Sequence, residues 1–152
     1  MTNLRPTWLA ALLVIGIAGT PAFAVDTATT TDAPDLAAVR AKIKAKDWSA
    51  AIAELNGMID RGVQHADVYN LLGFSLRNQG DTGTAQTWYQ KALEFDPDHR
   101  GALEYQGELY VKLGDLTKAQ ANLAKLVKLC PQGCEERADL EEAIKTRTVK
   151  VR

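Results

Sequence analysis

Two consecutive stretches decide the fold: residues 65–97 read HADVYNLLGFSLRNQGDTGTAQTWYQKALEFDP, and residues 99–131 read HRGALEYQGELYVKLGDLTKAQANLAKLVKLCP. At a spacing of 34 residues, eight of the 33 paired positions are identical, where composition alone would give about two. The identical pairs are His65/His99, Gly73/Gly107, Gly80/Gly114, Asp81/Asp115, Ala85/Ala119, Gln86/Gln120, Lys91/Lys125 and Pro97/Pro131. The period indicates a repeated structural unit, and it continues more weakly upstream through Asp47, Ala51 and Leu55.

Each unit is predicted to be a pair of helices. Residues 68–79 carry apolar or small side chains at helical spacing. Gly80 suits a left-handed C-terminal cap, and Asp81 suits the N-cap of a second helix that Asp96-Pro97 ends. The next unit repeats these signals with Gly114, Asp115 and Pro131, whereas the first unit has Lys46 in place of the glycine but keeps Asp47.

Small residues are expected where the helices of a pair meet. Gly73 and Gly107 on the first helices, with Ala51, Ala85 and Ala119 on the second, let the axes approach near the close end of the usual ~8–10 Å. Larger side chains should fill the remaining space: Tyr89 and Leu123 within units, and Leu93 and Val127 towards the next unit.

This pattern resembles the tetratricopeptide repeat. The second unit has Tyr69, Leu72, Gly73, Leu76, Ala85, Tyr89, Ala92 and Pro97 at that family's signature positions, and the third keeps Gly107, Tyr110, Ala119 and Pro131. The resemblance implies an all-α, right-handed superhelical stack of two to three antiparallel helix pairs, over about residues 35–65, 66–99 and 100–131. It also implies a concave face, lined by first helices, that binds peptides or proteins.

The N-terminal residues 1–24 have the features of a secretory signal peptide. Arg5 precedes an apolar run of 12 residues, 8–19, and Ala22-Phe23-Ala24 forms a small-x-small cleavage site. The run is shorter than the roughly 20 residues of a membrane span. We expect cleavage after Ala24 and a periplasmic or secreted protein without a membrane span, with an uncleaved anchor as the alternative. Residues 25–34 are Thr-rich and predicted to be a flexible linker.

Residues 132–146 are predicted to form a capping helix, because Leu140, Ala143 and Ile144 make one narrow apolar stripe. Residues 147–152 form a basic tail. Cys130 and Cys134 flank the turn before the cap, and in an oxidising compartment such a close pair normally forms a disulfide. Redox exchange or Cu(I) binding by this C-x₃-C pair are the alternatives, although the spacing differs from the C-x-x-C redox motif.

Composition and motifs argue against several other classes. The chain of 152 residues has 18 Lys and Arg against 19 Asp and Glu, which does not suit a general nucleic-acid binder. His65 and His99 lie one period apart, which is too far to share a metal ion. No nucleophile elbow, Walker loop, dinucleotide fingerprint or HExxH motif occurs. We therefore predict no enzyme activity, catalytic residue, metal or cofactor.

The concave face is the predicted ligand site. The register places on it Arg40 and Lys44 of the first unit, Asn70, Phe74 and Arg77 of the second, and Glu104, Glu108 and Lys112 of the third. The family's Lys/Asn/Arg clamp for a C-terminal carboxylate is not reproduced. The hypothesis is a ligand with an apolar anchor and a basic end near Glu104 and Glu108. The competing interpretation is a set of ordinary solvated helix charges.

The predicted function is therefore an exported protein–protein interaction module, acting as an adaptor, scaffold or assembly factor. A thiol or Cu(I)-handling protein and a self-associating structural subunit are the alternatives. The partner, its binding motif and the oligomeric state do not follow from the sequence.

Overall fold

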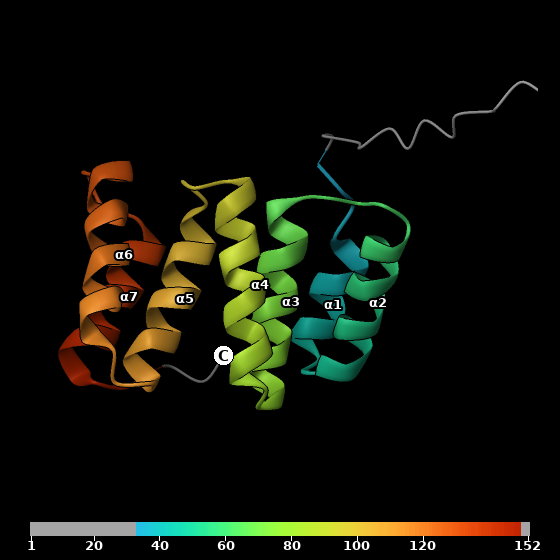
Figure 1. Ribbon diagram of the computed structural model, residues 1–152, viewed down its shortest axis with the longest axis horizontal. Helices are drawn as coiled ribbons and strands as arrows, with labels where there is room; N and C mark the ends of the chain where they lie inside the picture. The colour runs from blue at the N-terminus through green and yellow to red at the C-terminus, as the bar shows by residue number, and fades with distance from the viewer. Residues whose placement is uncertain (1–32, 150–152) are drawn as a thin grey trace, which may run out of the picture.

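The computed structural model describes residues 33–149, which form helices joined by short turns (Figure 1). The helices are α1 (Ala37–Lys44), α2 (Trp48–Asp60), α3 (Ala66–Gln79), α4 (Thr82–Phe95), α5 (Arg100–Lys112), α6 (Leu116–Leu129) and α7 (Glu135–Thr146). Consecutive helices pack in pairs, α1 with α2, α3 with α4 and α5 with α6, while α7 packs against both α5 and α6. The predicted all-α stack of helix pairs is confirmed.

The second helix of every pair begins at an aspartate, as predicted. The Oδ1 atoms of Asp47, Asp81 and Asp115 accept hydrogen bonds from backbone N–H groups three residues later, at 3.0, 3.0 and 3.2 Å. These bonds satisfy donors that the first turn of a helix leaves without a partner. Each pair therefore turns at the same point of the 34-residue period.

The turn within each pair requires a left-handed residue. Gly80 and Gly114 have φ values of 107° and 79°, and the equivalent Lys46 adopts 57°. A side chain in this region meets the following carbonyl, which costs roughly 1–2 kcal/mol. The first pair makes the same turn without the glycine, because its Asp47 cap and helix packing impose the geometry.

Close helix contact in the second pair depends on Gly73. A Cβ atom added there would lie 2.8 Å from the ring of Tyr89 and 3.2 Å from the backbone oxygen of Ala85. Tyr89 and Ala85 are both fully buried. The absence of a side chain on α3 thus lets α4 approach and lets the Tyr89 ring fill the interface.

Gly107 differs from the expectation. A Cβ atom there would lie 2.6 Å from Cδ2 of Leu140, so its close neighbour is α7 and not the second helix of its own pair. Leu123, which replaces Tyr89 in this repeat, is only half-buried. Val127 was expected to pack towards the next unit, but it is 39% exposed. The cap α7 lies against α5 and α6 without covering this part of α6.

A disulfide joins the last repeat to the cap. Cys130 follows the end of α6, Cys134 precedes α7, and the two cysteines are bonded with their Cα atoms 6.0 Å apart. The bond holds the start of α7 near the end of α6. Leu140 and Ala143 of α7 are buried. The predicted disulfide and capping helix are thus both present.

The predicted signal segment (residues 1–24), nearly all of the linker and the last three residues of the basic tail lie outside the described residues. Among residues 33–149, no helix combines the length and apolar character that crossing a bilayer requires.

Replacing Ala85 with leucine tests the helix pairing. Ala85 is fully buried against α3. A leucine there would overpack the helix contact, so Ala85→Leu should lower the free energy of unfolding by roughly 1–3 kcal/mol. Gln90→Leu, on the exposed side of the same helix, is the control and should have little effect. Thermal unfolding followed by circular dichroism measures both, and an unchanged Tm for Ala85→Leu would contradict the pairing.

Candidate functional site

The candidate site lies on the surface formed by α1, α3, α5 and α7, here called the first-helix face. α3 and α5 contact each other directly, as do α5 and α7. The face is hollowed at two places, one at the N-terminal ends of α3, α5 and α7 and one near the C-terminal ends of α3 and α5. Six of the eight predicted ligand residues line one or the other of these pockets, whereas Lys44 and Phe74 line neither.

The first hollow, here called the acidic pocket, brings together Arg40, Asn70 and Glu104 of the predicted set. Its complete lining is Arg40, Asp67, Asn70, Leu71, Asp96, Asp98, His99, Arg100, Gly101, Glu104, Tyr105, Glu135 and Glu136. Six carboxylates therefore face two arginines, which leaves an excess of four formal negative charges. The residues come from α1, α3, α5, α7 and the turn before α5, so only the assembled stack creates the pocket.

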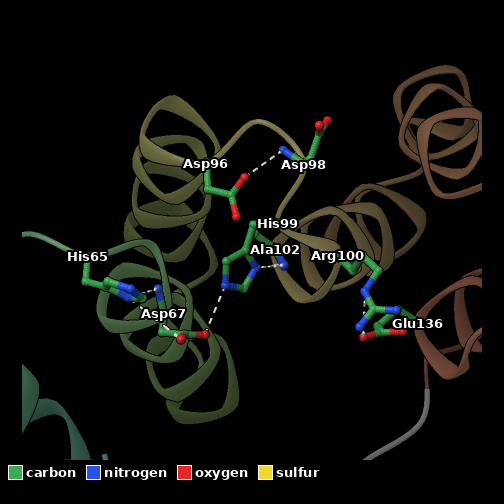
Figure 2. A network of polar contacts seen from close by, with 8 residues as sticks. All are labelled: His65, Asp67, Asp96, Asp98, His99, Arg100, Ala102 and Glu136. Carbon is green, nitrogen blue, oxygen red and sulfur yellow. Dashed lines mark hydrogen bonds and ion pairs between the residues drawn. The ribbon is translucent and has the colours of Figure 1, made fainter. Parts of the chain in front are cut away.

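A histidine links two repeats at the base of this pocket. His99 Nδ1 accepts a hydrogen bond from the backbone N–H of Ala102 at 3.0 Å and so caps α5. Its Nε2 lies 3.0 Å from Oδ1 of Asp67 on α3, and Figure 2 shows the two side chains directed towards each other. This arrangement requires the proton on Nε2, which donates to Asp67. The hydrogen bond from His99 holds the pKa of Asp67 below its usual range, despite an opposing effect of burial.

Other polar contacts hold the rim of the pocket. Arg100 Nε lies 3.6 Å from Oε1 of Glu136 and so links α5 to α7 (Figure 2). The backbone N–H of Asp98 donates to Oδ1 of Asp96 at 3.1 Å. His65 Nδ1 accepts from the backbone N–H of Asp67 at 3.1 Å and caps α3. His65 thus caps its own helix, whereas His99 caps α5 and also contacts α3.

Phe74 and Arg77 are both buried, although both were predicted to face a ligand. The Phe74 ring packs against Tyr105 with centroids 4.8 Å apart and against Trp48 at 5.9 Å. Arg77 Nη1 donates to Oε2 of Glu108 at 2.8 Å, and the two side chains are 7% and 1% exposed. The predicted charges on neighbouring repeats thus neutralise each other across the α3–α5 interface.

The second hollow contains the remaining charged candidates and the start of the tail. Arg77, Glu108 and Lys112 line it together with residues 147–149. Val149 packs onto the cluster that contains Tyr110 and Val111, so this part of the tail lies against the C-terminal end of α5. Lys44 is exposed near the end of α1, outside both sets of lining residues.

The alternatives based on metal or thiol chemistry receive no support from the geometry. Cys130 and Cys134 are bonded to each other, so in this state they present no thiolate to copper or to a redox partner. Within residues 33–149, no three His, Cys, Asp or Glu side chains gather where they could hold a metal ion.

Several residues of the acidic pocket were not predicted. The predicted ligand residues lie beyond the first turn of each first helix, whereas Asp67, Glu135 and Glu136 occupy first turns. Asp96 was predicted only to end a helix together with Pro97, and no role was predicted for Asp98. Extending the 34-residue register to the start of each first helix would have found Asp67 and Glu135, which lie two periods apart.

A stack of helix pairs with a hollowed first-helix face defines a helical-repeat protein of the interaction-module class. The repeats themselves are tetratricopeptide repeats: family models with that description match residues 66–99 and 102–133. The chain therefore contains two tetratricopeptide repeats. Such proteins are typically non-catalytic scaffolds for protein interaction.

Two curated proteins share part of this sequence. The "Uncharacterized protein ycf37" of Pyropia yezoensis is 32% identical over 72 residues, which cover 47% of this chain and 40% of that protein. The "Cellulose synthase 2 operon protein C" of Komagataeibacter xylinus is 34% identical over 98 residues, which cover 64% of this chain and 8% of that protein. The similarity thus spans less than half the length of either relative.

The buried ion pair between the repeats can be tested by Arg77→Met. Loss of the guanidinium removes the 2.8 Å ion pair of the deeply buried Glu108 carboxylate, which should cost about 3 kcal/mol of unfolding free energy. Adding Glu108→Gln should recover part of this loss, because it removes the buried negative charge. Arg100→Met, whose pair with Glu136 is half-exposed, should cost less than about 1 kcal/mol. Urea unfolding that finds equal losses for the two single variants would contradict this assignment.

Proposed function

We propose that this chain is an exported adaptor or assembly factor that binds a segment of a protein partner on its first-helix face. The acidic pocket is the observation that carries the proposal, because residues from three repeats and the cap converge on one open hollow. A tetratricopeptide scaffold supplies the general binding role, and no residue of the pocket needs to react with its ligand.

The proposed export depends on the N-terminal sequence and on the cysteines. Residues 1–24 have the charge, apolar run and cleavage site of a signal peptide. The Cys130–Cys134 disulfide supports the same compartment, since such bonds persist in oxidising surroundings. Within that compartment, the chain would hold its partner through contacts made by side chains from several repeats.

Peptide selection tests the proposed binding face. Random short peptides displayed on phage are selected on the mature protein, and enriched peptides are then bound to variants that carry p-benzoylphenylalanine at Arg40 or at Lys112. These two positions border the two hollows of the first-helix face, so irradiation should crosslink the peptide to one or both. Gln86 and Gln90 on α4 line a separate surface, and the same substitution there is the control.

Failure to enrich any peptide, or crosslinking from Gln86 and Gln90 as strong as from Arg40 and Lys112, would contradict binding on the first-helix face.

The intact mass of the protein isolated from the cell envelope tests export and oxidation together. We expect a chain that begins at Val25 and is lighter by two hydrogen atoms than the reduced form, because the disulfide removes one hydrogen from each cysteine. A mass that retains Met1 would contradict cleavage. A mass that rises neither on reduction nor on subsequent alkylation of new thiols would contradict the disulfide.

A further inference from the structure

The acidic pocket contains a buried acceptor that the fold does not use. Asn70 is only 4% exposed, and its Oδ1 atom accepts no hydrogen bond from any described residue. The residue lies on the pocket wall, on the side of α3 that faces Gly101 of α5. A buried acceptor left without a donor is costly, so this atom indicates a ligand that brings a donor.

The surrounding charges define which donor suits the pocket. Several carboxylates have local structural roles: Asp67 bonds to His99, Asp96 holds the turn, and Glu136 pairs with Arg100. These contacts explain individual positions but leave the excess of negative charge over the pocket as a whole. Glu104, one repeat after Asn70 at the same register, adds a carboxylate that is 4% exposed on the same wall.

We propose that the acidic pocket binds an arginine side chain of the partner segment, an inference that rests on the proposed binding role of the first-helix face. A guanidinium group offers five N–H donors in one plane and carries a permanent positive charge. Such a group can donate to Asn70 Oδ1 while the carboxylates of α3, α5 and α7 compensate its charge. The half-buried Tyr105 also lines the pocket, and its ring already contacts Phe74 and the Arg77 guanidinium.

An anionic ligand is the competing occupant. The helices α3, α5 and α7 direct their N-termini to this side, and the partial positive charge of a helix N-terminus attracts anions. First-turn acids already occupy those positions on α3 and α7, namely Asp67, Glu135 and Glu136. Arg100 is engaged by Glu136, and an Asn70 oxygen repels an anion, so the pocket favours a cation.

The experiment compares three forms of one display-selected peptide by fluorescence anisotropy: the arginine form, the form with that arginine replaced by citrulline, and the form with lysine. Citrulline keeps the shape of arginine but removes its charge. With the wild-type protein, the citrulline form should bind at least about tenfold more weakly, and the lysine form should fall between the two. An anionic peptide, in which glutamate replaces the arginine, should bind most weakly.

Two variants connect the effect to the pocket. Glu104→Gln should weaken the arginine peptide by about tenfold but leave the citrulline peptide unchanged, because only the charged form loses a partner. Glu94→Gln on α4, outside the pocket, is the charge-matched control and should change neither. Asp98→Asn, at an exposed pocket position, replaces Glu104→Gln as the test variant if Glu104→Gln does not fold, and it too should weaken the arginine peptide but not the citrulline peptide.

Asn70→Leu separates a binding role from a structural one. Since Oδ1 of Asn70 makes no hydrogen bond to the described residues, the leucine variant should keep the Tm of the wild type while losing affinity for the arginine peptide. A lower Tm with unchanged affinity would overturn the assignment.

The two proposals fail in different ways. If enriched peptides crosslink to the first-helix face but contain no arginine, or if the citrulline form binds as tightly, the arginine subsite is wrong and the binding face stands. If the anionic peptide binds more tightly than the arginine form, the sign of the proposed ligand charge is wrong. If no peptide is enriched, the proposed function itself fails.

Discussion

The whole structure depends on close approach between helices at two glycines. At Gly73 the ring of Tyr89 occupies the space where a side chain would stand, and at Gly107 the side chain of Leu140 does so. The first contact closes the second helix pair, and the second seats the cap on the last repeat. Interiors are packed as densely as molecular crystals, so a shift at either glycine would move every element that follows. The surface proposed to bind a partner depends on these two contacts.

Stacking at a constant period gives the first-helix face its chemistry. Side chains one period apart, such as Asn70 and Glu104, come to lie on one wall although 34 residues separate them. The ion pair between Arg77 and Glu108 and the hydrogen bond between His99 and Asp67 cross the α3–α5 interface at two levels. These polar contacts join α3 to α5 alongside the ring contact between Phe74 and Tyr105. The Cys130–Cys134 bond then holds the start of α7, and with it Glu135 and Glu136, at the edge of the acidic pocket.

The sequence predicted what local signals encode. Aspartate caps, glycine turns and the buried positions of Ala85 and Tyr89 follow from short-range rules, and the structure shows all of them. Lys46 shows that the turn persists without its preferred residue, since tertiary packing overrides local preference. The site was less predictable, because its charges are coupled across repeats. A helix register places Arg77 and Glu108 on the same face, but it does not reveal that they meet and become buried. Likewise, Val127 repeats the position of Leu93, and only the placement of the cap decides that it stays exposed.

We propose that the stacked repeats bind a partner segment on the first-helix face, with its cationic group at the N-terminal ends of α3, α5 and α7. Hydrogen–deuterium exchange of the mature protein, with and without a bound display-selected peptide, tests this binding mode. We expect slower exchange in the first turns of these three helices and in the turn at residues 96–99, with α4 and α6 unchanged. Protection concentrated in α4 and α6, with none in the first turns of α3, α5 and α7, would contradict it.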